Sequence, residues 1–182
     1  MGGREDRLLP HRRLARHDDG DPGADGALAH VQRTVAGGHT PAADALAQRI
    51  GLPFEDLDLL RQALIHSSYT NDHPALQAAS NQRLEFLGDA VVALAFSDEL
   101  FRQHPDDDEG TLTARRAALV STPGLARLAE RIGLSDYVVL GEGAERAGER
   151  RRPSVLEAAF EAVVGAIHVT FGFERTRDWL IK

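Results

Sequence analysis

The chain has 182 residues, a length that suits one globular domain with some additional sequence at an end. It contains no cysteine, which excludes disulfide frameworks, thiol nucleophiles and cysteine-ligated zinc, so any bound metal must be held by oxygen or imidazole. The formal net charge is -7, which argues against a protein that coats nucleic acid through its overall charge.

The chain shows no sign of a membrane or secretory segment. No apolar run approaches the roughly 18 residues that a membrane span requires, and the basic N-terminus is not followed by the apolar core of a signal peptide. A soluble protein of the cytoplasm, with no membrane partner, is therefore expected.

Composition divides the chain into two parts. Residues 1–40 are rich in Gly, Asp, Arg, His and Pro and are expected to be a disordered N-terminal extension, whereas residues 41–182 are expected to form one folded domain. Apolar residues at three-and-four spacing predict helices over residues 42–52, 54–68, about 81–103, about 109–120, 122–133, 153–171 and 173–182. Loops are expected at residues 69–80 and 136–153, where only "YVVL" suggests a strand. The predicted fold class is all-α.

Two of these helices carry acids where apolar residues are expected. In "NQRLEFLGDAVV", Glu85 and Asp89 lie four residues apart and therefore project from one helix face. In "PSVLEAAFEAVVGAIHV", Glu157 and Glu161 repeat this spacing. Carboxylates in an apolar setting repel each other and lose hydration, so a cation must compensate them. Ion pairs with Arg83 or another arginine are one alternative.

A divalent cation is the other alternative. Magnesium takes several oxygen ligands, and acids from facing helices of a bundle can supply them. Glu109, at a predicted helix start, is a further candidate ligand. Mg²⁺ or Mn²⁺ is favoured over zinc because no histidines stand at ligand spacing. A metal held by carboxylates activates water and stabilises a phosphoryl group in transfer, so phosphodiester hydrolysis is the leading chemistry.

The motif "NQRLEFLGDAV" closely resembles the signature of ribonuclease III, the family of endonucleases that cut double-stranded RNA. "LIHSSYTND", "HPDDDEGTLTARRAALVS" and "PSVLEAAFEAVVGAIHV" resemble other segments of the family in the same order, so the likeness covers roughly residues 42–182. The resemblance implies an all-α endonuclease domain that works as a homodimer, binds an RNA duplex between its subunits and leaves 5′ phosphate and 3′ hydroxyl ends. Processing of RNA such as ribosomal precursors is the implied role.

The resemblance also assigns site residues. It implies that Glu85, Asp89, Glu109 and Glu161 bind the metal, with Asp89 and Glu161 catalytic, and that Phe86 inserts into the partner subunit. Basic residues suited to phosphate contacts are Arg115, Arg116, Arg150, Arg151 and Arg152.

The chain departs from the family pattern at two positions. Gln82 stands where the signature usually has an acid, and Ala158 stands where the family has an aspartate three residues before the final glutamate. Glu157 is adjacent and is expected to be solvated rather than to take that place. These departures keep open a weakened family member that acts as a dimeric module binding double-stranded RNA or a ribonucleoprotein. A structural helical dimer with ion-paired acids is a third reading.

Typical bacterial members of the family that the chain resembles carry a double-stranded RNA-binding domain after the nuclease domain, whereas this sequence ends at "DWLIK". The last predicted helix has no Gly or Pro stop before Lys182, which favours a natural protein that continues beyond this residue.

Overall fold

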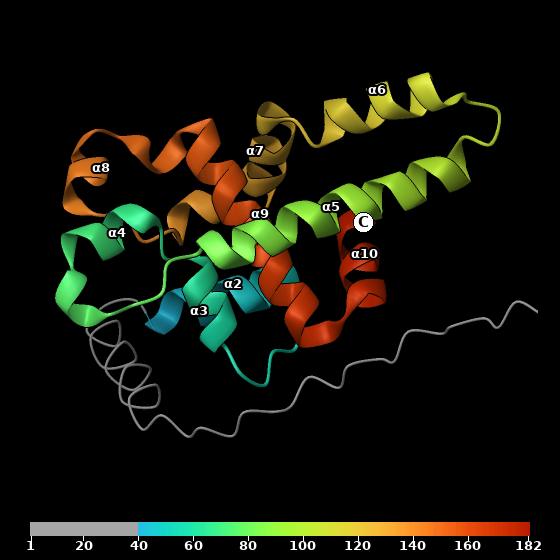
Figure 1. The fold of residues 1–182 in the computed structure, drawn as a ribbon. Helices are drawn as coiled ribbons and strands as arrows, with labels where there is room; N and C mark the ends of the chain where they lie inside the picture. The colour runs from blue at the N-terminus through green and yellow to red at the C-terminus, as the bar shows by residue number, and fades with distance from the viewer. Residues whose placement is uncertain (1–39) are drawn as a thin grey trace, which may run out of the picture.

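The computed structural model describes residues 40–182, and in this part of the chain every regular element is helical apart from one isolated bridge between Ile65 and Val139 (Figure 1). The α-helices are α2 Thr40–Ile50, α3 Asp58–Ala63, α4 Ser67–Asp72, α5 Gln82–Gln103, α6 Glu109–Leu119, α7 Thr122–Arg131, α8 Glu142–Arg146, α9 Pro153–Phe171 and α10 Phe173–Ile181. Short 3-10 turns are η1 Pro74–Leu76, η2 Leu134–Asp136 and η3 Glu149–Arg151. The all-α prediction is confirmed; the extension predicted over residues 1–40 lies outside the described residues except for Thr40.

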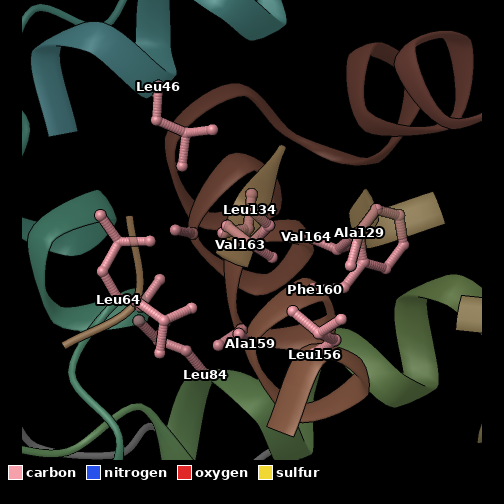
Figure 2. Close-up of a cluster of buried hydrophobic side chains, with 14 of the residues drawn as sticks. Leu46, Leu64, Leu84, Ala129, Leu134, Leu156, Ala159, Phe160, Val163 and Val164 are labelled. Carbon is pink, nitrogen blue, oxygen red and sulfur yellow. The ribbon is translucent and has the colours of Figure 1, made fainter. Parts of the chain in front are cut away.

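Helix α9 is the centre of the core. Its residues from Val155 to Ile167 are mostly buried, and Figure 2 shows Leu156, Phe160 and Val163 of this helix among side chains from other helices, such as Leu46 and Leu84. Removing apolar side chains from water on all sides of one helix supplies the main driving force for folding.

The length and apolar character of α9 correct one sequence expectation. Its mean hydropathy is 1.4 over an 18-residue window, enough by length and composition for a membrane span. However, 61% of that window is buried inside the fold, as expected for a helix surrounded by other helices in a protein core. The statement that no segment approaches this length is therefore wrong for residues 153–171.

Helices α5 and α9 approach each other closely at two glycines. A Cβ atom added to Gly88 of α5 would lie 1.7 Å from the carbonyl oxygen of Glu161 on α9, and one added to Gly165 would lie 2.3 Å from the carbonyl oxygen of Leu84. Backbone therefore packs against backbone at this crossing, which only glycine permits. Figure 1 shows the long helix α5 lying across α9, with α6 returning alongside its far end.

Several predicted helix ends are confirmed by the capping interactions. Ser121 caps α7 by accepting a hydrogen bond from the Gly124 amide at 3.2 Å, and Gly133 follows α7 with a φ of +64°. The start of α6 is set by Asp108, whose carboxylate accepts from the Thr111 amide at 2.8 Å. The capping prediction for α5 is only partly right, because Asn81 precedes the helix but its side chain makes no capping hydrogen bond.

The segment predicted as one helix over 54–68 is instead divided. Helix α3 ends at Ala63, because the Val139 amide donates to the Leu64 carbonyl at 2.8 Å and the His66 amide donates to the Val139 carbonyl at 3.0 Å. These long-range bonds replace the next helical turn, which no local pattern reveals.

Both predicted loops also contain helical turns. Residues 69–80 include the end of α4 and all of η1, and α4 is tied to α8 because Asp72 accepts from the Glu142 amide at 2.8 Å. Residues 136–153 include α8 and η3, and Val138, Val139 and Leu140 are buried rather than exposed. Tertiary hydrogen bonds and burial order these segments despite their polar, Gly-rich composition.

The glycine contact between α5 and α9 leads to a stability prediction. Gly88→Ala is expected to lower the free energy of unfolding by about 3 kcal/mol or more, since the added methyl group meets backbone that cannot rotate away. Gly143→Ala is the matched control, because Gly143 is also helical but a Cβ there would have no atom within 4 Å. Urea denaturation measures both; equal stability of the two variants would contradict the close crossing.

Candidate functional site

The α5–α9 crossing places four acids around its point of closest approach. Glu85 and Asp89 flank Gly88 on α5, and the backbone of Glu161 on α9 contacts that same glycine. Glu157 lies one turn before Glu161 on the same side of α9. Glu85, Asp89 and Glu161 therefore lie near one another within a single chain, as the sequence predicted.

Glu161 is the deepest of these acids. It is only 8% exposed, and it is one of three buried polar or charged residues in the described core. Burial raises the pKa of its carboxyl group to about 8, and the charges of Asp89, Glu157 and Glu85 add to the rise in that order. The carboxylate form of Glu161 is thus costly unless a cation is added.

Glu85 shares this environment to a lesser degree. It is half-buried, and burial raises its pKa, followed by the charges of Glu157 and then Asp89. Asp89 is exposed at the rim of the crossing, so the site is open to solvent on one side. The four acids consequently form one electrostatic unit with a buried floor and an accessible rim.

This arrangement changes the expectation for Glu157. It is half-buried rather than fully solvated, and its charge raises the pKa of both Glu85 and Glu161. The expectation that Glu157 is solvated is therefore wrong. Its four-residue spacing from Glu161 predicted one shared helix face, but that spacing does not show which side of α9 packs against α5.

Among residues 40–182, the four acids have no compensating cation. Within residues 40–182, no lysine or arginine forms an ion pair with Glu85, Asp89, Glu157 or Glu161, and none of these carboxylates accepts a hydrogen bond. The alternative in which Arg83 or another arginine neutralises them is therefore wrong for the described chain. The reading as a purely structural domain with ion-paired acids loses its basis for the same reason.

The chemistry of these side chains fits a hard divalent cation. Carboxylate oxygens are the ligands that Mg²⁺ and Mn²⁺ prefer, and a buried, unpaired glutamate such as Glu161 gains from a nearby positive charge. As the side chains stand, no three acidic or histidine side chains of the described chain converge into a ready-made metal site. Binding would therefore require rotation of the flexible glutamates toward one point.

Glu109 lies apart from the other predicted ligands within one chain. It is the exposed first residue of α6, it accepts a hydrogen bond from Thr113 Oγ1 at 3.1 Å, and it is not among the acids that act on Glu161. Helix α6 starts beyond the end of α5, about 20 Å along that helix from Asp89 at 1.5 Å per residue (Figure 1). Its role as a metal ligand stays a prediction.

The arginines proposed for phosphate contacts differ in availability. Arg150 is already engaged: it forms an ion pair with Glu145 at 2.6 Å and donates to the carbonyls of Ser135 and Val138 at 2.8 and 2.7 Å. Arg151 and Arg152 are exposed beside it, with only a 3.4 Å contact from Arg152 to Glu149. Arg150 thus holds the loop that presents the other two.

The two arginines of α6 also have partners in the chain. Arg115 pairs with Asp107 at 2.6 Å while remaining exposed, and the half-buried Arg116 donates to Ser97 Oγ at 3.1 Å. An exposed ion pair contributes little stability, so Arg115 can exchange Asp107 for a phosphate at small cost.

Phe86 is the most exposed large apolar residue of the described chain. Its side chain is 83% exposed, in the same turn of α5 as Glu85. Ala90 and Leu94 follow at four-residue spacing and are also exposed, so they continue an apolar stripe along α5. A stripe of this kind indicates a surface that another molecule covers.

Trp179 packs within the fold. Its indole Nε1 donates to the carbonyl of Ile50 at 3.1 Å, and its ring stacks on Phe160 with centroids 6.1 Å apart. His66 likewise serves the fold, since its side chain accepts from the Ser68 amide at the start of α4.

The raised pKa of Glu161 leads to a prediction about stability and pH. Between the unperturbed pKa of 4.5 and about 8, the folded chain binds more protons at Glu161 than the unfolded chain does. Stability in a chelating buffer is therefore expected to fall as pH rises through this window, and Glu161→Gln is expected to reduce that fall. Melting temperatures recorded from about pH 5 to about pH 8 measure the difference.

Comparison between variants isolates this effect. Burial lowers the pKa of His66, which makes stability rise with pH, but this contribution is common to parent and variant. Glu130→Gln, at an exposed position of α7, is the control and should follow the parent curve. Superimposable curves for the parent and Glu161→Gln would contradict the raised pKa.

Comparison with known proteins bears on the identity of this site. Residues 56–182 match the family model described as Ribonuclease-III-like. The chain is 44% identical over 137 residues to Ribonuclease 3 from Listeria monocytogenes serotype 4a, and the match covers 75% of this chain and 60% of that protein. Ribonuclease 3 from Pelotomaculum thermopropionicum is 47% identical, over 75% of this chain and 57% of that protein. The chain thus spans about 60% of the length of these relatives.

Solved structures show the same fold. The nuclease domain of ribonuclease III from Campylobacter jejuni superimposes with a TM-score of 0.69 and 38% identity, covering 75% of this chain and 91% of that one, and it is described as having a flexible region involved in dimer formation. Dicer from Pichia stipitis has a TM-score of 0.51 and 27% identity over 71% of this chain and 54% of that one. The acid-lined crossing thus lies in a nuclease-domain fold, and the chain belongs to the ribonuclease III family.

Proposed function

We propose that the chain is the nuclease domain of a metal-dependent endoribonuclease that hydrolyses phosphodiester bonds in double-stranded RNA. The observation that carries this proposal is the set of unpaired carboxylates at the α5–α9 crossing, with Glu161 buried and without a counter-charge. Membership of the ribonuclease III family supports the reaction class.

The acids of the proposed site differ in how deeply they are buried. Glu161 and Glu85 form the floor, Asp89 forms the open rim, and together they provide the negative field that concentrates a divalent cation, preferentially Mg²⁺ with Mn²⁺ as an alternative. When bound, such a cation supplies charge neutralisation at the phosphoryl group and activation of water. Glu109 is a further proposed ligand, as the family resemblance implies. The expected products carry 5′ phosphate and 3′ hydroxyl ends.

The RNA is proposed to contact arginines beyond the acid site. Arg115, Arg151 and Arg152 have exposed guanidinium groups, and the half-buried Arg116 is the neighbour of Arg115 on α6. Such groups bind the phosphates of an A-form duplex without reading its sequence. Maturation of ribosomal RNA precursors in the cytoplasm is the proposed setting.

The working unit is proposed to be a homodimer. The exposed stripe of Phe86, Ala90 and Leu94 is the part of α5 suited to contact a second copy. The Campylobacter jejuni nuclease domain, which is described with a region involved in dimer formation, supports this assembly. Because Phe86 adjoins Glu85, dimer formation would set the position of the catalytic helix.

A second candidate function has one observation in its favour. Ala158 cannot ligate a metal, and no three acids of the described chain already converge into a metal site. A non-cutting dimeric module that binds double-stranded RNA or a ribonucleoprotein is therefore the alternative.

Cleavage of a perfectly paired RNA duplex tests the main proposal. The parent chain is expected to cut the duplex with Mg²⁺ but not in a chelating buffer, whereas Asp89→Asn and Glu161→Gln are expected to lose at least about 100-fold in rate, since metal chemistry contributes several kcal/mol. Gel analysis of labelled RNA measures the rate and the end groups.

Glu99→Gln, on the same helix α5 and outside the acid cluster, is the control and should cut like the parent. If the folded parent retains duplex RNA but leaves it intact over a range of Mg²⁺ and Mn²⁺, the binding-module alternative replaces the nuclease.

Truncation of Phe86 tests the dimer. Phe86→Ala is expected to weaken self-association by about tenfold or more, because a buried aromatic anchor is commonly worth 2 kcal/mol or more at an interface. Analytical ultracentrifugation measures the dissociation constant. Val169→Ala, which shortens a 53% exposed side chain on α9, serves as control. Unchanged association of Phe86→Ala would rule out the stripe as the contact.

A further inference from the structure

Glu157 is an acid of the crossing to which the family resemblance gives no role. It lies on α9 one turn before Glu161, about 40° away around the helix axis. Position 158, where this chain has Ala158, lies roughly 60° from Glu161 in the other direction. Both positions border the side of α9 that Glu161 turns toward α5.

The contact between the helices fixes which way that side faces. The backbone of Glu161 abuts Gly88, and the backbone of Gly165 abuts Leu84, so this side of α9 lies against the first turns of α5. Glu85 and Asp89 flank Gly88 there. A carboxylate on Glu157 is carried by a side chain one methylene longer than aspartate, which lets it reach the same space from the neighbouring position.

The surroundings of Glu157 agree with this placement. It is half-buried, and within the described chain it has no hydrogen-bond or ion-pair partner. This partial burial agrees with a side chain that lies along the helix crossing.

An independent observation points to a ligand among these acids. Glu161 is more than nine-tenths buried, and in residues 40–182 no donor or cation satisfies its carboxylate. A buried polar group of this kind is costly unless something else binds it. The other acids of the crossing, Asp89, Glu157 and Glu85, supply no counter-charge to it.

We propose that Glu157, the fourth acid of the α5–α9 crossing, is a carboxylate ligand of the divalent-cation site, and that it does from position 157 what Ala158 cannot. The inference rests on the proposed function, since it assigns a residue to the cation site postulated there. With Glu157 as a ligand, the site keeps the carboxylate that Ala158 does not provide.

Titration of Mn²⁺ into the full 182-residue chain by calorimetry, without RNA, tests the assignment. Glu157→Gln keeps the shape of the side chain and is expected to weaken Mn²⁺ binding by about tenfold or more, because cation affinity follows the number of charged ligands. The double variant Glu157→Gln with Ala158→Asp returns a carboxylate to the site from the adjacent position and is expected to restore binding. Glu99→Gln should bind Mn²⁺ like the parent.

A second readout is independent of the metal. In a chelating buffer at neutral pH, Glu157→Gln is expected to raise the melting temperature, because it removes one negative charge from the acids gathered at the crossing, whereas Glu99→Gln should not. A residue that merely faced solvent would change neither measurement.

The possible results separate the two hypotheses. If the parent binds Mn²⁺ and cuts duplex RNA but Glu157→Gln binds Mn²⁺ as tightly as the parent, the role of Glu157 is refuted and the nuclease proposal stands. If the parent binds no Mn²⁺ and cuts no RNA, both are refuted. Weaker binding by Glu157→Gln together with restoration by Ala158→Asp supports the assignment.

Discussion

The structure depends on the contact between α5 and α9, where Gly88 and Gly165 allow two helix backbones to touch. Glycine usually weakens a helix, yet here it stands in the middle of both central helices, because a methyl group would separate them. The same contact that completes the core sets the distance between the acids of one helix and those of the other. The packing of the core and the placement of the acids therefore rest on the same few atoms.

This contact also concentrates negative charge where a fold is normally apolar. Glu161 lies one turn before Gly165 in the most buried helix of the described chain, and Glu85 lies one turn before Gly88. Neither acid is paired with an arginine, although arginines such as Arg115 and Arg150 form ion pairs elsewhere in the same domain. Uncompensated burial lowers stability, and it is tolerated at functional sites, where a ligand restores the balance.

Much of the site could be predicted from the sequence because it depends on local spacing. The four-residue intervals in "NQRLEFLGDAVV" and in "PSVLEAAFEAVVGAIHV" predicted one acid-bearing face on each helix, and both helices formed close to the predicted bounds. The partial burial of Glu157 was not predicted, because the angular position of a residue around one helix does not show which neighbouring helix packs against it. The place of Glu109, at the far end of α5, likewise depends on the direction in which α6 returns.

The sequence by itself determined the helical class, the start of α7 after Ser121, its end before Gly133, and the identity of the acids. Periodicity, capping and turn preferences act over only a few residues, so these features can be predicted locally. Only the tertiary structure decided that the 54–68 segment breaks at Leu64, that Val138–Leu140 is buried, and that Arg150 is engaged within its loop. These features arise from hydrogen bonds and contacts between segments that are distant in the chain. Neither the entropy lost in bringing such segments together nor the hydrogen bonds gained can be read from a local sequence pattern.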